Sequence, residues 1–211
     1  HLKRMLACDD FEIRTAWLEK DEEHGLSEDV LCDTDVLLWW GHARHGDVRD
    51  DVAARVAEHV RNGMGFIALH SAHHSKPFKA LMGTSCSLQW NDINQRAHVW
   101  TVKPTHPIAQ GVPMEFTLDV EEMYGEYFNI PEPDDLIFVT WYQDGHVFRG
   151  GCTFTRSAGK IFYFHPGHET GNSFFNPNVI RVIKNAIYWA KPIEKKNYRA
   201  SECVEPLEEV R

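Results

Sequence analysis

The stretch that decides the expected fold reads Gly63-Met-Gly-Phe-Ile-Ala-Leu-His-Ser-Ala-His-His-Ser75. Its apolar run, residues 66–69, is long enough for a buried β-strand and too short for a helix. Three histidines follow the run, and Ser75 can then cap a helix that carries Pro77 in its first turn. We therefore expect a strand, a sharp polar turn and a helix. In an open parallel sheet, ligands bind at the carboxyl ends of strands, which is where these histidines fall.

The preceding residues extend this unit to a β-α-β motif. Residues 36–40 form a continuous apolar run, typical of a strand that is covered on both faces. Asp47 is expected to cap the helix that follows, on which a valine recurs every four residues. The four valines are Val48, Val52, Val56 and Val60. Both predicted strands of the motif thus end in histidines, the first in His42 and His45.

The rest of the chain predicts one α/β domain, residues 1–193, and a charged tail, residues 194–211. A helix is expected at 1–7, and a last helix at 177–190, capped by Asn176. A doubly wound domain normally starts with a strand, so we expect a first strand upstream of His1. Further strands are predicted at 11–17, 98–102, 116–120, 136–141, 145–155 and 160–164.

The composition excludes several classes of protein. The 211 residues are 43% hydrophobic and 25% charged, with a net charge of -9, which argues against nucleic acid as a partner. No apolar run approaches the length of a membrane span, so we expect no membrane partner. The cysteines are odd in number and scattered without a CxxC pair, which is typical of free thiols in the cytoplasm. They are Cys8, Cys32, Cys86, Cys152 and Cys203.

Histidines gather at three predicted strand ends. If these strands are neighbours, their polar ends converge on one crevice, where imidazoles can bind a metal or transfer protons. Glu121, Glu122 and Glu126 could reach the same crevice. Any single histidine is more often a surface or hydrogen-bonding residue, but the three groups together favour a shared site. The groups are His42 with His45, then His70 with His73 and His74, and finally His165 with His168 and Glu169.

Other chemistries are less well supported. Cys86 or Cys152 could be a nucleophile, although buried structural cysteine is commoner, and Ser71 lacks the G-x-S-x-G elbow. No glycine-rich phosphate loop is found, so no nucleotide cofactor is expected. A few aromatic residues could either stack on sugars or pack in the core. They are Trp90, Tyr124, Tyr127 and Phe128.

Four blocks stand in order along the chain: Trp39-Trp40-Gly41-His42, Leu69-His70-Ser71-Ala72-His73, Glu121-Glu122-Met123-Tyr124-Gly125-Glu126 and Pro166-Gly167-His168-Glu169-Thr170. Together they resemble the trehalose-utilisation (ThuA-like) family over nearly all of residues 1–193. The resemblance implies the class I glutamine amidotransferase fold, a flavodoxin-like three-layer α/β sandwich with a mainly parallel sheet. In amidotransferases the turn carries a cysteine nucleophile in a Cys-x-Gly-His run, but His70 takes the place of that cysteine here.

The family name implies that the chain handles a disaccharide, a keto-sugar or a related glycoside. The first hypothesis is an enzyme that uses acid–base or metal-assisted chemistry, with His70, Glu122 and His168 as catalytic residues. His42, His70 and His168 would hold one divalent metal, zinc first among the candidates. The sugar would be bound by five further residues: His45, His73, Tyr124, Arg149 and Glu169.

Two alternatives remain open. The chain could be a non-catalytic sugar-binding or regulatory protein that kept the fold and lost the nucleophile. It could also be an amidotransferase that uses Cys86, which ranks last because this cysteine lies beyond the predicted turn. Aromatic-rich loops and the charged tail lead us to expect a homo-oligomer.

Overall fold

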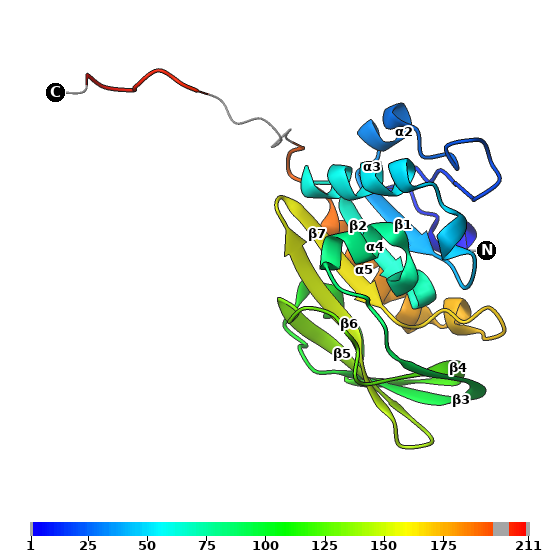
Figure 1. Cartoon of the computed structure of the whole chain (residues 1–211). Coiled ribbons are helices and arrows are strands. Elements are labelled where there is room, and N and C mark those ends of the chain that lie inside the picture. Colours follow the sequence, from blue (N-terminus) through cyan, green and yellow to red (C-terminus); the bar gives the residue numbers. More distant parts are fainter. Residues whose placement is uncertain (1, 196–202, 210–211) are drawn as a thin grey trace.

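The computed structural model describes residues 2–195 and 203–209 and contains one seven-stranded sheet, with strand order β1-β2-β7-β6-β5-β3-β4 (Figure 1). The expected tail thus falls partly on residues outside the described ones. The helices are α1 (Leu2–Leu6), α2 (Glu28–Cys32), α3 (Asp50–Arg61), α4 (Lys76–Met82) and α5 (Pro177–Ala190). The strands are β1 (Val36–Trp40), β2 (Gly65–Leu69), β3 (Gln89–Thr101), β4 (Glu115–Gly125), β5 (Asp135–Tyr142), β6 (Val147–Arg156) and β7 (Gly159–Phe164).

Strands β1, β2 and β7 are parallel and carry the helices. Helices α3 and α4 cover one face of this half of the sheet, and α5 covers the other (Figure 1). The β-α-β motif is confirmed: every residue of β2 is buried, and Val52, Val56 and Val60 of α3 face the core. Ser75 caps α4 by accepting from the amide of Phe78, and Asn176 caps α5, both as expected.

The expected mainly parallel sheet is wrong, because four of the six strand pairings are antiparallel. Only Ser157 and Ala158 lie between β6 and β7, and only residues 143–146 lie between β5 and β6. Such short connections allow antiparallel pairing alone, since a parallel pair needs a crossover of about a dozen residues or more. Strands β5, β6, β3 and β4 therefore curl away from the helical half as an antiparallel wing (Figure 1).

The N-terminal region also differs from the expectation. Residues 11–17 are not a strand: Phe11 packs on the ring of Tyr188, and Arg14 forms an ion pair with Asp33. These side-chain contacts hold the segment against the domain without a strand partner. The segment and β1 line a cavity of about 1250 Å³, so β1 is half-buried and not covered on both faces.

Two smaller expectations also need correction. Asp47 does not cap α3, because it lies in a 3-10 turn and accepts from Arg44, and Arg49 precedes the helix instead. The strand expected at 116–120 continues as β4 through the acidic residues to Gly125. None of the helices in the described part of the chain combines the length and apolarity that crossing a bilayer requires.

Candidate active site

The turn after β2 places His70 at the centre of the molecule. Its backbone has φ +54°, a left-handed conformation that costs a non-glycine residue about 1–2 kcal/mol. The conformation turns the chain sharply, so that the imidazole, which is fully buried, stands at the carboxyl end of the strand. Its Nδ1 donates to the carbonyl of His165 at 3.1 Å. This hydrogen bond uses Nδ1 as the donor and turns Nε2 toward the site, where it faces Glu122.

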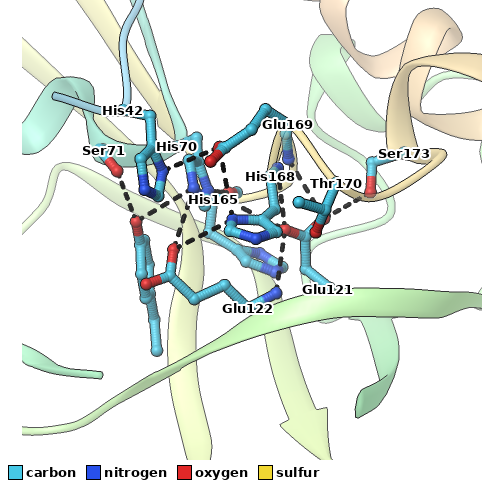
Figure 2. Close-up of polar contacts among 12 residues, drawn as sticks. His42, His70, Ser71, Glu121, Glu122, His165, His168, Glu169, Thr170 and Ser173 are labelled. Carbon is cyan, nitrogen blue, oxygen red and sulfur yellow. Dashed lines mark hydrogen bonds and ion pairs between the residues drawn. The ribbon is translucent and has the colours of Figure 1, made fainter. Parts of the chain in front are cut away.

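Four side chains, which we call the four-residue cluster, meet at this point: His42, His70, Glu122 and His168 (Figure 2). His42 follows β1, His70 follows β2 and His168 follows β7, whereas Glu122 lies in β4. One ligand atom from each lies within 4.8 Å of all the others. Glu122 Oε2 is 3.1 Å from His70 Nε2 and 3.5 Å from His168 Nδ1. The structure thus brings the three predicted metal ligands together and adds the predicted catalytic glutamate.

The cluster contains polar atoms that the protein itself does not satisfy. Among the described residues, His42 Nδ1, Glu122 Oε2 and His168 Nδ1 are buried and have no hydrogen bond of acceptable geometry, although a carboxylate or imidazole lies near each. A buried polar atom without a hydrogen bond costs about 1–3 kcal/mol. Three such atoms lie together in the four-residue cluster, which is where a bound group would satisfy them.

Within the cluster, the imidazole of His70 and the carboxylate of Glu122 shift each other's pKa. Burial alone would lower the pKa of His70, but the contact with Glu122 and the charges of Glu121 and Glu122 outweigh it, so its pKa is raised above 6.5. Burial would likewise raise the pKa of Glu122, and the two neighbouring histidines outweigh it, so this pKa is lowered from 4.5. Glu122 is therefore ionised beside His70, and an ionised carboxylate can accept a proton or bind a cation.

A second carboxylate, Glu121, holds the loop that carries His168. The side chain of Glu121 is fully buried and accepts from the amides of Gly167 at 3.2 Å and His168 at 3.0 Å, and from the hydroxyl of Ser173 (Figure 2). Gly167 has φ +140°, and a Cβ there would lie 2.7 Å from Phe174. Only glycine therefore lets the loop pass at this point.

The rim of the cluster carries further polar groups. Glu169 Oε2 lies 2.9 Å from His42 Nδ1, and the Tyr124 ring stacks on His70 with centroids 5.1 Å apart. The Tyr124 hydroxyl is 2.8 Å from Ser71 Oγ. Asp92 reaches His168 Nε2 at 3.4 Å from an irregular part of β3. Sequence reasoning missed Asp92, because its position beside the site results from the pairing of β3 with β4, which leaves no local pattern.

Three predicted sugar-binding residues have other surroundings. His45 stands beside His74, and burial lowers its pKa to about 4. His73 contacts Tyr124 at the edge of the site, but its Nδ1 is 2.7 Å from the carbonyl of Cys86. The structure does not bring Arg149 into the cluster, because its guanidinium is held by Glu126 and by the carbonyl of Phe128.

The two buried cysteines are poorly placed for nucleophilic chemistry. Burial raises the pKa of Cys86, and it raises the pKa of Cys152 to about 12. The imidazole of His73 contacts the backbone carbonyl of Cys86, and its Nδ1 is 2.7 Å from that oxygen. Both thiols therefore stay protonated near neutral pH, which weighs against an amidotransferase that uses Cys86.

Comparison with known protein families finds one match. The family described as ThuA, trehalose utilisation, matches residues 1–190. No curated protein matches the sequence.

Solved structures with the same fold include a ThuA-like protein from Parabacteroides merdae, which is 16% identical with a TM-score of 0.65, over 92% of this chain and 85% of that one. A ThuA-like protein from Bacteroides uniformis has 16% identity and a TM-score of 0.59, over 81% and 74% of the two chains. The cytoplasmic protein STM3548 from Salmonella typhimurium has 13% identity and a TM-score of 0.53, over 79% and 76%. At these identities the likeness concerns the fold alone.

Proposed function

Because the chain belongs to the ThuA (trehalose utilisation) family, we propose that it is an enzyme acting on a disaccharide, keto-sugar or related glycoside with the help of one divalent metal. The metal would be held by the histidines of the four-residue cluster. The observation that carries the proposal is the convergence of three buried, unsatisfied ligand atoms on one point. The proposal includes a cytoplasmic location and a homo-oligomeric state.

The chemistry of the donors favours zinc. Three imidazole nitrogens are a donor set that suits zinc, and catalytic zinc sites use three protein ligands and keep one position open. His42, His70 and His168 supply three nitrogens. The hydrogen bond from His70 Nδ1 to the His165 carbonyl orients one ligand, and Glu121 fixes the backbone of another.

Glu122 would be the general base of the reaction. An ion held by the histidines would polarise a water or a sugar oxygen. Glu122 takes the proton from the water as its oxygen bonds to the sugar carbon. The bond from that carbon to the leaving oxygen breaks, and the carboxyl returns the proton to the leaving oxygen. The carboxylate form of Glu122 suits this role.

Elemental analysis of the untagged protein, purified without chelator, tests the proposal. We expect about one zinc, manganese or iron per chain, as for a single site with this donor set. His42→Ala and His168→Ala should each lose most of it. His98→Ala is the matched control, because His98 also pairs with a carboxylate, that of Glu115, but lies outside the cluster. Protein that takes up none of these ions after incubation with each would contradict the metal site.

A sugar-binding protein without catalysis is the second candidate. It is favoured by His70, which stands at the turn where amidotransferases carry their cysteine, so the fold can persist without a thiol nucleophile. Glu122→Gln separates the two functions. In an enzyme this substitution should lower turnover by a factor of about 10²–10⁴ with modest change in sugar affinity. In a binding protein it changes the affinity alone, and no product forms with either variant.

A further inference from the structure

Trp90 lies beside the site and has no role in the chemistry described above. It is directly opposite Tyr124 in the antiparallel pair of β3 and β4. Residues opposite each other in such a pair point to the same face of the sheet, with Cβ atoms about 5 Å apart. Tyr124 stacks on His70 and Glu122 contacts the same ring, so this face is the one that looks onto the four-residue cluster.

The neighbours of Trp90 agree with this orientation. Asp92, two residues further along β3, reaches His168 from the same face. Met123 and His146 occupy the opposite face of the hairpin, since a Cβ on Gly125, which follows Tyr124, would contact them. Trp90 therefore shares its face with Tyr124, Glu122 and Asp92.

The indole is open to solvent. Its exposed fraction is 63%, whereas Tyr124 beside it is 2% exposed. A tryptophan left uncovered next to a buried polar cluster offers a large flat apolar surface and one N–H donor. Asp92, 61% exposed at its side chain, adds carboxylate oxygens next to that surface. An apolar plane with acceptors at its side matches a pyranose ring, whose C–H face is apolar and whose edge carries hydroxyls.

We propose that Trp90 and Asp92 form a sugar subsite at the rim of the active site. The indole stacks on the C–H face of one pyranose unit, and Asp92 accepts from its hydroxyls. The neighbouring unit then reaches His70 and Glu122. The substrate class is accordingly a glycoside with at least two units, one bound at the rim and the other at the cluster. This inference rests on the proposed function for the identity of the ligand.

The test is calorimetric titration of trehalose and of methyl α-D-glucopyranoside, carried out in a Glu122→Gln background, in which turnover is slow and all the histidines of the cluster stay in place. We expect Trp90→Ala to weaken trehalose binding by about tenfold, the upper range for an aromatic contact. Trp90→Phe keeps a ring and should bind within about threefold of the parent. Asp92→Asn should weaken both sugars by a few-fold, because an amide accepts from a hydroxyl less strongly than a carboxylate.

Trp141→Ala is the matched control. Trp141 is also an exposed tryptophan of the wing, at 47%, but its neighbours Thr140 and Tyr142 point to the interior, so it lies on the opposite face. Equal affinity in Trp90→Ala and Trp141→Ala would overturn the subsite, and so would a parent protein that binds neither sugar. Metal content is measured separately on the wild-type protein. Failure of the subsite and failure of the metal site are therefore distinguishable.

Discussion

At the residue scale, Glu121 shows how a buried charge can serve a site without taking part in its chemistry. Its carboxylate accepts hydrogen bonds from two backbone amides and one hydroxyl of the segment 167–173, which carries His168, and from the amide of Glu122. In Glu121→Gln the amide group would turn an N–H₂ toward these donors. We expect the free energy of unfolding to fall by about 1–3 kcal/mol, measured by urea denaturation.

Metal affinity gives a second measurement on Glu121. A residue with a merely structural role would not change this affinity. A residue that orients a ligand changes metal affinity by about 10–100-fold when mutated. Titration with zinc should show this loss in Glu121→Gln. Glu115→Gln is the control, because Glu115 lies on the same strand and pairs with His98 away from the cluster. Unchanged zinc affinity in Glu121→Gln would show that His168 is held by other contacts.

The cysteines permit a prediction from pKa and exposure together. Cys86 and Cys152 are buried with raised pKa values, whereas Cys8, Cys32 and Cys203 are exposed. Because only the thiolate reacts, iodoacetamide at pH 8 should label the three exposed cysteines and spare the two buried ones in the native protein. Mass spectrometry of the labelled peptides gives the result. Rapid labelling of Cys86 would instead support a reaction in which this thiol is the nucleophile.

At the element scale, the end of β4 is tied to β6 by an ion pair. Glu126 accepts from the guanidinium and the backbone amide of Arg149, and from the amide of Phe128. Burial would raise the pKa of Glu126, but these contacts outweigh it, so its pKa is lowered from 4.5. The contact therefore fixes the position of the loop that follows β4 on the wing.

The lowered pKa fixes the sign of the pH dependence. A carboxylate with a depressed pKa in the folded protein stabilises it above the unfolded pKa, and this stability is lost as the pH falls through the folded value. Glu126→Gln should lower the free energy of unfolding by about 1–3 kcal/mol at pH 7. The difference from wild type should shrink below about pH 4. Urea denaturation over this range measures it, with the exposed Glu12→Gln as control. A difference independent of pH would contradict the ion pair.

Elements with strong local signals could be predicted from the sequence. The cap at Asn176 and the isoleucine spacing mark α5, and glycines and an apolar run mark β2. The direction of the strands was harder to derive. The resemblance suggested a parallel sheet, but the short loops before and after β6 make its pairings with β5 and β7 antiparallel. The histidines of the site stand at strand ends and were visible in the sequence. Asp92 and Trp90 face the site through strand pairing between distant segments, which no local pattern records.

At the scale of the whole molecule, the site lies where two kinds of sheet meet. The parallel half supplies His42, His70 and His168 from the ends of its three strands, and the antiparallel wing supplies Glu122 and Tyr124 from β4. The helical half thus positions the three histidines, and the wing positions the carboxylate of Glu122. A ligand bound to all of them would link segments that are far apart in the sequence.

This linkage predicts how the metal affects stability. A group that binds only the folded chain stabilises it by about 2.7 kcal/mol at a free concentration of 100 times its Kd. For a chain of this size that corresponds to a rise in Tm of about 5–11 °C. Treatment with a chelator should remove this increment, and added zinc should restore it, as measured by differential scanning calorimetry. His42→Ala is the informative variant, because His42 is 33% exposed at its side chain and its loss leaves the core intact. If that variant still gained the same increment from zinc, the ion would be stabilising the protein from somewhere other than the four-residue cluster, for example the group Glu28, Cys32 and His59 on α2 and α3.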